Sequence, residues 1–97
     1  MNITFTKNDS TLSVALEGRL DTTTAPEFEA FVNENAAGVT ALTVDCRKLA
    51  YVSSAGLRVL LAAHKKMKGA IKLVGVGELV MEVFEMTGFA DIFDISR

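Results

Sequence analysis

The chain is poor in the residues that most cross-linking and much site chemistry require. Its single cysteine, Cys46, excludes an internal disulfide and a cysteine-rich zinc site. No apolar run approaches the ~20 residues that a membrane-spanning helix needs. A formal charge of −2 and an isoelectric point near 5.3 argue against a general nucleic-acid binder. We therefore expect neither membrane insertion nor direct contact with nucleic acid.

The first residues also lack an export signal. Residues 1–6 alternate between apolar and polar side chains instead of forming an apolar run, so we place the protein in the cytoplasm. Of its 97 residues, 49% are hydrophobic and 23% are charged. This composition is typical of one globular domain, which we expect to span residues 1–97.

The spacing of the apolar residues predicts strands and helices in alternation. The expected strands cover residues 3–6, 12–17, 41–44, 71–76 and 91–95. The expected helices cover residues 25–37, 56–67 and 78–87, and each is followed within two residues by a glycine. Thr24 and Glu27 fit a capping box at the start of the first helix.

The order of these elements, ββαβαβαβ, predicts an α/β fold. A hairpin followed by three β–α–β alternations calls for a mixed, mostly parallel sheet with an antiparallel edge and helices packed on it. The helix expected at 56–67 has a broad apolar arc, which indicates packing against that sheet.

Two serines stand where a strand gives way to this helix. Ser53 and Ser54 are followed by the small residues Ala55 and Gly56, which leave the backbone open to approach by another protein. Helix N-termini favour negative charge, because their first N–H groups lack internal partners and the peptide dipoles align. A serine there can cap the helix, act as a nucleophile or carry a phosphate. Capping is the common use and contributes about 1 kcal/mol.

A nucleophilic serine needs a base, and the chain offers only one histidine. His64 lies ten positions after Ser54 on the apolar arc of the same helix, about 15 Å away along the axis. That distance excludes an intrachain dyad, and no G-x-S-x-G motif surrounds the serines. We therefore predict that the protein is not an enzyme and that His64 is a partly buried core residue.

The sequence predicts no metal and no cofactor. Residues 75–77, Gly-Val-Gly, hint at a dinucleotide loop, but Val80 stands where a third glycine is needed. Asp21 and Asp45 do not make a dense ligand cluster. We expect Asp45 to support the serine loop through hydrogen bonds instead.

Four short motifs follow one another along the chain. They are Glu17-Gly18-Arg19-Leu20-Asp21 with the helix start after it, Leu42-Thr43-Val44-Asp45, and Tyr51-Val52-Ser53-Ser54-Ala55-Gly56-Leu57, with the late segment Phe84-Glu85-Met86-Thr87-Gly88-Phe89. Together, in this order and spacing, they resemble the STAS family and in particular its anti-sigma factor antagonists. The resemblance covers essentially the whole chain, and the family fold agrees with the order ββαβαβαβ.

The resemblance implies a partner-switching role. The unmodified antagonist binds an anti-sigma factor that is also a serine kinase, and this frees the sigma factor. Phosphorylation releases the antagonist, and a serine phosphatase resets the cycle. The modified residue maps to Ser54, two positions before Gly56. The partner-binding residues implied by the resemblance are Asp21, Thr22, Ser53, Ser54, Ala55, Gly56 and Arg58.

The chain departs from the family pattern at one position. Many members have Asp immediately before the phosphorylated serine, and Ser53 occupies that place here. Ser53 is therefore a second candidate for modification. The alternative function is a non-phosphorylated STAS subunit of a larger assembly, such as the cytoplasmic component of a transporter, in which the serine loop serves only for packing.

Overall fold

A computed structural model describes all 97 residues, and its sheet begins with a hairpin. β1 (Asn2–Asn8) pairs antiparallel with β2 (Thr11–Leu20). The short connection turns at Asp9, whose φ of 55° is a left-handed conformation that aspartate adopts more readily than most residues. The hairpin expected from the sequence is confirmed.

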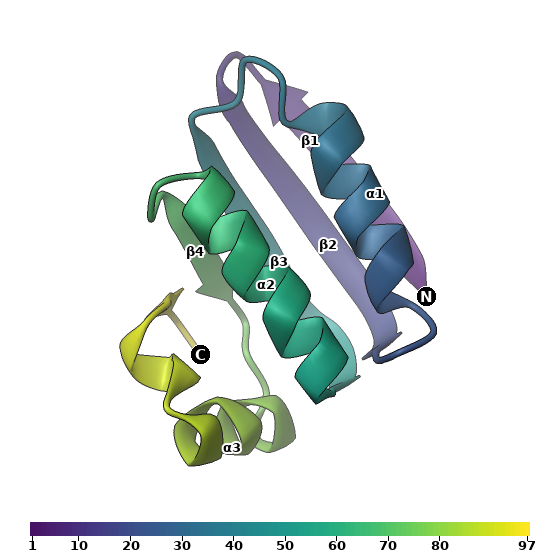
Figure 1. The fold of residues 1–97 in the computed structure, drawn as a ribbon, viewed down its shortest axis with the longest axis vertical. Helices are drawn as coiled ribbons and strands as arrows, with labels where there is room; N and C mark the ends of the chain where they lie inside the picture. Colours follow the sequence, from purple (N-terminus) through teal and green to yellow (C-terminus); the bar gives the residue numbers. More distant parts are fainter.

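The remaining strands join this hairpin in parallel. Along the chain follow α1 (Ala25–Asn35), β3 (Ala41–Val52), α2 (Ser54–Lys66), β4 (Ile71–Val74), α3 (Glu78–Thr87), the 3₁₀ helix η1 (Phe89–Asp91) and β5 (Asp94–Ile95). The sheet has the order β1-β2-β3-β4-β5, and only the β1–β2 pair is antiparallel. The predicted α/β fold with a mixed, mostly parallel sheet is confirmed (Figure 1).

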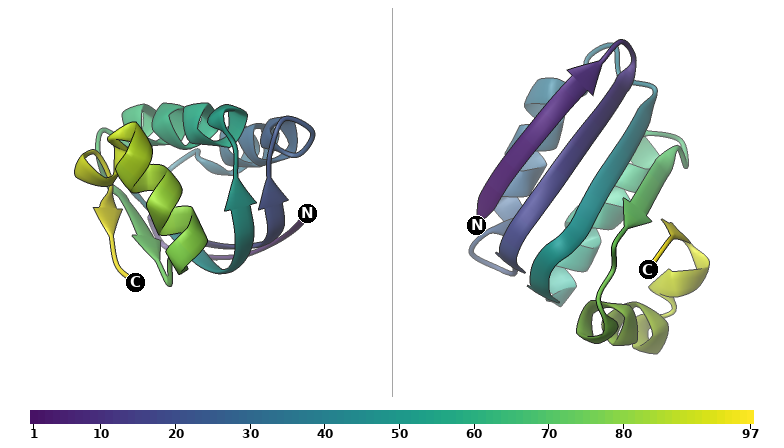
Figure 2. Two further views of the ribbon diagram at one scale, coloured as in Figure 1. Left: turned by 90° about the horizontal axis from the view of Figure 1, so that it is seen from below. Right: turned by 180° about the vertical axis from the view of Figure 1, so that it is seen from behind.

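Two helices cover one face of the sheet. The connections β2–α1–β3 and β3–α2–β4 step across the sheet in the same direction, and right-handed crossovers therefore place both helices on the same side. Figure 2 shows α1 and α2 side by side on that face and no helix over the opposite face. α3 lies at the carboxyl end of the strands and contacts β3.

The core lies between the sheet and the helices. Leu12, Val14 and Leu16 of β2 point into it, and the residues between them do not, as expected for a strand that is covered on one face. Phe28 of α1 and Phe84 of α3 are fully buried, and each burial contributes about 1.5–3 kcal/mol. No polar or charged side chain is buried, so all ionised groups remain at or near the surface.

Some element boundaries differ from the sequence prediction. β3 has 12 residues and continues to Val52, beyond the expected 41–44, because two register shifts against β2 extend the pairing. The shifts let the consecutive residues Arg47 and Lys48 both face solvent, which breaks the alternation that would have indicated a strand. α1 ends at Asn35, and β5 keeps only two residues. None of the helices has the length and apolar character needed to cross a bilayer.

Candidate functional site

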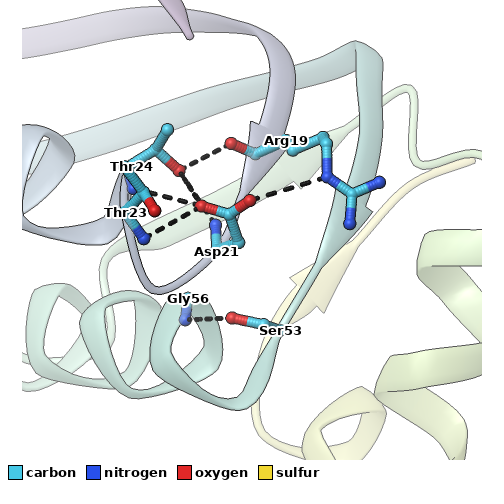
Figure 3. Close-up of polar contacts among 6 residues, drawn as sticks. All are labelled: Arg19, Asp21, Thr23, Thr24, Ser53 and Gly56. Atoms are coloured by element: carbon cyan, nitrogen blue, oxygen red, sulfur yellow. Dashed lines mark hydrogen bonds and ion pairs between the residues drawn. The ribbon is translucent and has the colours of Figure 1, made fainter.

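Two loops meet at the carboxyl end of β2 and β3. The strands are parallel, and their last residues, Leu20 and Val52, are register partners. The backbone N–H of Ser53 donates a 2.9 Å hydrogen bond to the carbonyl of Leu20. The loop before α1 and the start of α2 therefore lie against each other (Figure 3).

Asp21 organises the loop before α1. Its Oδ1 atom accepts hydrogen bonds from the N–H groups of Thr23 and Thr24, at 3.0 and 3.2 Å. The hydroxyl of Thr24 donates to the carbonyl of Arg19 at 2.6 Å and accepts from the N–H of Asp21 at 2.9 Å. The side chain of Thr24 is thus engaged by the end of β2.

The predicted capping box at α1 is wrong. Thr24 is the N-cap residue, but its side chain makes no hydrogen bond to the first turn of the helix. Instead the carbonyl of Asp21 accepts the N–H of Ala25 at 2.7 Å, and the carboxylate of Asp21 accepts the N–H groups of Thr23 and Thr24. The Thr24 hydroxyl is occupied by the Arg19 carbonyl and the Asp21 N–H. The N–H of Glu27, which a capping box assigns to that hydroxyl, bonds the carbonyl of Thr24 at 3.0 Å instead.

The carboxylate of Asp21 is held in its charged form. The backbone N–H of Thr24 contributes most to lowering the pKa of Asp21 below its usual value, and Thr23 and Arg19 add to it. Nε of Arg19 lies 3.5 Å from Asp21 Oδ2. The same guanidinium stands over the ring of Tyr51, 4.4 Å from its centroid. A carboxylate, a guanidinium and an aromatic ring are therefore presented together beside the serine loop.

The two serines have different surroundings. Ser53 is the N-cap of α2, and its Oγ accepts a 3.4 Å hydrogen bond from the N–H of Gly56. The capping role expected for this pair therefore falls to Ser53. Ser54 is the first residue of the helix, is exposed, and makes no side-chain hydrogen bond within the protein. Its hydroxyl is free to meet another molecule.

Gly56 lets α2 pack against the end of β2. A Cβ atom at this position would stand 2.6 Å from the carbonyl oxygen of Leu20 and 2.9 Å from a methyl group of Val52. Gly56 is buried, so it offers a partner no surface. This corrects the expectation that Gly56 contacts a partner: its role is to bring the two loops together.

The other residues expected to bind a partner border a shallow groove between α1 and α2. Thr22 and Arg58 are exposed, and Ala55 is half-buried. The groove has a volume of about 280 Å³, and its walls include Thr22, Pro26 and Glu29 on one side and Ala55, Arg58 and Val59 on the other. The structure thus brings Asp21, Thr22, the two serines and Arg58 to one end of the molecule.

Asp45 does not belong to this site. It lies within β3, eight residues before Ser53, which is more than roughly 20 Å along an extended strand. Its carboxylate accepts the backbone N–H of Arg47 at 3.0 Å and forms an ion pair with the guanidinium of the same residue at 3.7 Å. The prediction that Asp45 supports the serine loop is wrong, because β3 continues well past the point where it was expected to end.

The remaining candidates have structural surroundings. His64 is partly buried, as predicted, and packs edge-on against the ring of Phe93, with ring centroids 5.5 Å apart. Gly75 is in a turn with φ 65°, and the side chain of Arg47 lies directly against it. No three His, Cys, Asp or Glu side chains are grouped to hold a metal ion.

Sequence reasoning missed two side chains of this surface, Arg19 and Tyr51. They are register partners on neighbouring strands, which places the guanidinium over the ring. A signal was present, since both residues lie in the motifs that carry the family resemblance. Their contact depends on a register shift next to Gly18 that no sequence pattern announces.

Comparison with known proteins places this arrangement in a family. A family model described as the STAS domain matches residues 2–97. A relative from Bordetella bronchiseptica described as an anti-sigma factor antagonist, BtrV, is 34% identical, with the match covering 100% of this chain and 87% of the relative. The anti-sigma-B factor antagonist of Bacillus subtilis is 28% identical over 99% of this chain and 91% of the relative.

Solved structures show the same fold. An anti-sigma factor antagonist from Thermotoga maritima gives a TM-score of 0.89 at 18% identity, covering 98% of this chain and 86% of that one. SpoIIAA in its unphosphorylated form gives 0.83 at 17% identity, covering 99% and 89%. Bacillus SpoIIAA in its phosphorylated form gives 0.74 at 16% identity, covering 99% and 92%. At these identities the likeness establishes the fold alone.

Proposed function

The chain belongs to the STAS domain family, and from that premise we propose that it is an anti-sigma factor antagonist. Its unmodified form binds an anti-sigma factor and thereby frees a sigma factor in the cytoplasm. The observation that carries this proposal is the exposed, unbonded hydroxyl of Ser54 beside the ordered Asp21 loop. The names of two relatives that match nearly the whole chain support it.

The proposed switch is phosphorylation of Ser54 by an anti-sigma factor that is also a serine kinase. Ser53 is the weaker candidate, because its Oγ already accepts the N–H of Gly56 and a phosphate there would disturb the cap. Bacillus SpoIIAA, which has the same fold, has a solved structure in its phosphorylated form. A serine phosphatase would then restore the binding form of this chain.

The chain itself supplies binding and a modifiable hydroxyl, not catalysis. A serine nucleophile needs a base within hydrogen-bond reach. His64 lies ten residues along α2, about 15 Å from Ser54 at the helical rise, and packs against Phe93. We therefore propose that the kinase and the phosphatase carry out all the chemistry.

A phosphate on Ser54 would act through local electrostatics. It adds about −1.5 to −2 charge at neutral pH and three acceptor oxygens. The N-terminus of α2 tolerates that charge in the free protein. In a docked interface the same group would lose water, and an uncompensated buried charge costs on the order of 3–5 kcal/mol. That is roughly a hundred- to several-thousand-fold in affinity, enough to release the partner without a change of fold.

The test uses the kinase that co-purifies with the tagged chain from its own cells. After incubation with ATP, we expect intact-mass spectrometry to show one added phosphoryl group on the unmodified chain and on Ser53→Ala, and none on Ser54→Ala. The phosphorylated chain should bind the kinase at least a hundredfold more weakly than the unmodified chain. Modification at Ser53 would overturn the assignment. A chain that no kinase modifies would favour the alternative of a packing subunit in a larger assembly.

A further inference from the structure

One arginine of the protein has no ionic partner. Arg19 pairs with Asp21 at 3.5 Å, Arg47 with Asp45 at 3.7 Å, and Arg97 with Glu85 at 3.9 Å. Arg58, the remaining arginine, forms no ion pair or side-chain hydrogen bond and is exposed. This unpaired Arg58 lies four residues after Ser54 on the same helix.

Helix geometry brings these two side chains together. Residues four apart on a helix are neighbours, with Cβ atoms about 5–6 Å apart. Helical side chains also tilt toward the N-terminus, so a residue covers the turn before its own Cα. This tilt puts position 54 within reach of the Arg58 side chain, which borders the groove beside it. A guanidinium is the side chain best suited to bind a phosphate through two parallel hydrogen bonds.

No other charge on α2 competes near this position. The first turn of α2 contains no acidic residue, and its N-cap is the neutral Ser53. Glu29 of α1 lines the opposite side of the groove from Arg58, but the two form no ion pair. The Asp21 carboxylate is already engaged by backbone N–H groups and by Arg19. Arg58 is the free cation at this end of the molecule.

We propose that Arg58 is an internal receptor for the phosphoryl group on Ser54. In the unmodified protein its guanidinium is free at the groove, where a partner can use it. In the phosphorylated protein it folds back onto the phosphate. The modification thus adds negative charge to the docking face and withdraws a cation from it. This inference rests on the proposed function, because it assumes that Ser54 carries the phosphate.

The experiment installs phosphoserine at position 54 during translation, so no kinase is needed. Phosphorus NMR then gives the second pKa of the phosphate, which is near 6 in an unperturbed site. The variants are Arg58→Gln, Arg58→Lys and the control Lys65→Gln, which removes an equal charge from the far end of the same helix. The charged groups facing the phosphate are Arg58 on α2, Glu29 on α1, and Asp21 with Arg19 in the adjoining loop and strand.

We expect Arg58→Gln to raise the second pKa of the phosphate by about 0.2–0.4 unit, because the dianion loses its ionic partner. Arg58→Lys should give a smaller rise, and Lys65→Gln should give none. Equal shifts in the two Gln variants would mean that the phosphate senses only the net charge, and no shift in either would mean that Arg58 does not contact it. Either result would overturn the proposal. The phosphate is installed directly, so the titration can be read even if no kinase modifies Ser54. Conversely, if Arg58 does not bind the phosphate, the kinase assay of the proposed function is unaffected.

Discussion

At the scale of single residues, the site depends on the lack of a side chain at Gly56. Gly56 allows the first turn of α2 to approach the carbonyl of Leu20, and this approach sets Ser53 and Ser54 beside the Asp21 loop. Its backbone does not require glycine, because Gly56 is not among the residues with positive φ. Steric room is therefore the reason for glycine here, and that reason can be tested with one methyl group.

We predict that Gly56→Ala destabilises the protein by about 2–3 kcal/mol. The added Cβ would stand 2.6 Å from a backbone oxygen, which cannot rotate away as a side chain can. Denaturant unfolding measures the change. Gly77→Ala is the matched control, because no atom lies within 4 Å of its added Cβ, and it should cost less than about 1 kcal/mol. Equal losses in the two variants would show that Gly56 is not required for close packing.

Asp21 makes stability depend on pH in a defined direction. Its pKa in the folded protein is lowered, chiefly by the N–H of Thr24, so its stabilisation is present above the unfolded value near 3.8. That stabilisation is lost as the pH falls through the folded pKa, where the carboxylate gains a proton. We therefore predict that Asp21→Asn lowers the free energy of unfolding at pH 7, and that the difference from the unmodified chain shrinks by pH 3.

Denaturant unfolding at the two pH values measures this effect. Glu34→Gln serves as the control, since Glu34 is exposed on α1 and forms no ion pair or side-chain hydrogen bond. It should change stability little at either pH. A difference for Asp21→Asn that is the same at pH 7 and pH 3 would show that the charge of Asp21 does not stabilise the loop.

At the scale of elements, the sequence predicts strands and helices where the apolar residues recur regularly. It does not predict where the pairing of two strands becomes irregular. Leu12, Val14 and Leu16 alternate along β2, and Gly88 adopts the left-handed φ of 80° that ends α3, both as the sequence indicates. The second half of β3 escaped prediction because Arg47 and Lys48 face solvent in succession. That arrangement depends on register shifts with β2, which are long-range and leave no local signal.

The same division applies to the candidate site. The position of Ser54 at the start of α2 follows from local signals, namely small residues before an apolar helix. The capping-box pattern misled at α1, because the Thr24 hydroxyl bonds the Arg19 carbonyl at the end of β2 and not the first turn of the helix. The contact between Arg19 and Tyr51 and the isolation of Asp45 both follow from how far β3 extends.

At the scale of the whole molecule, one handedness rule assembles the site. Right-handed crossovers place α1 and α2 on the same face of the sheet, and each helix starts at the carboxyl end of the parallel strand that it follows (Figure 1). The Asp21 loop and the serine loop therefore share one end of the protein, while the core beneath contains no polar side chain. A charge added at Ser54 can change docking without reaching that core.

Cys46 offers a probe of whether this core opens as one unit. It lies in β3 at the centre of the sheet and is 1% exposed. Burial, with a smaller contribution from the charge of Asp45, raises the pKa of its thiol to about 12. The thiolate is the reactive form, so the native thiol should be inert at pH 8.

We predict that iodoacetamide alkylates Cys46 only through global unfolding. At pH 8 the folded chain should react more than about a thousandfold more slowly than the chain in urea, because the open state is that rare in a protein of ordinary stability. The atoms nearest to the Cβ added by Gly56→Ala belong to Leu20 and Val52, not to Cys46. The substitution should nevertheless accelerate alkylation roughly 30- to 150-fold, the factor that corresponds to its expected loss of stability. Mass spectrometry of quenched samples gives both rates. If the substitution destabilises the protein but leaves the alkylation rate unchanged, β3 opens locally, and the loops that meet at its end are not held by a cooperative core.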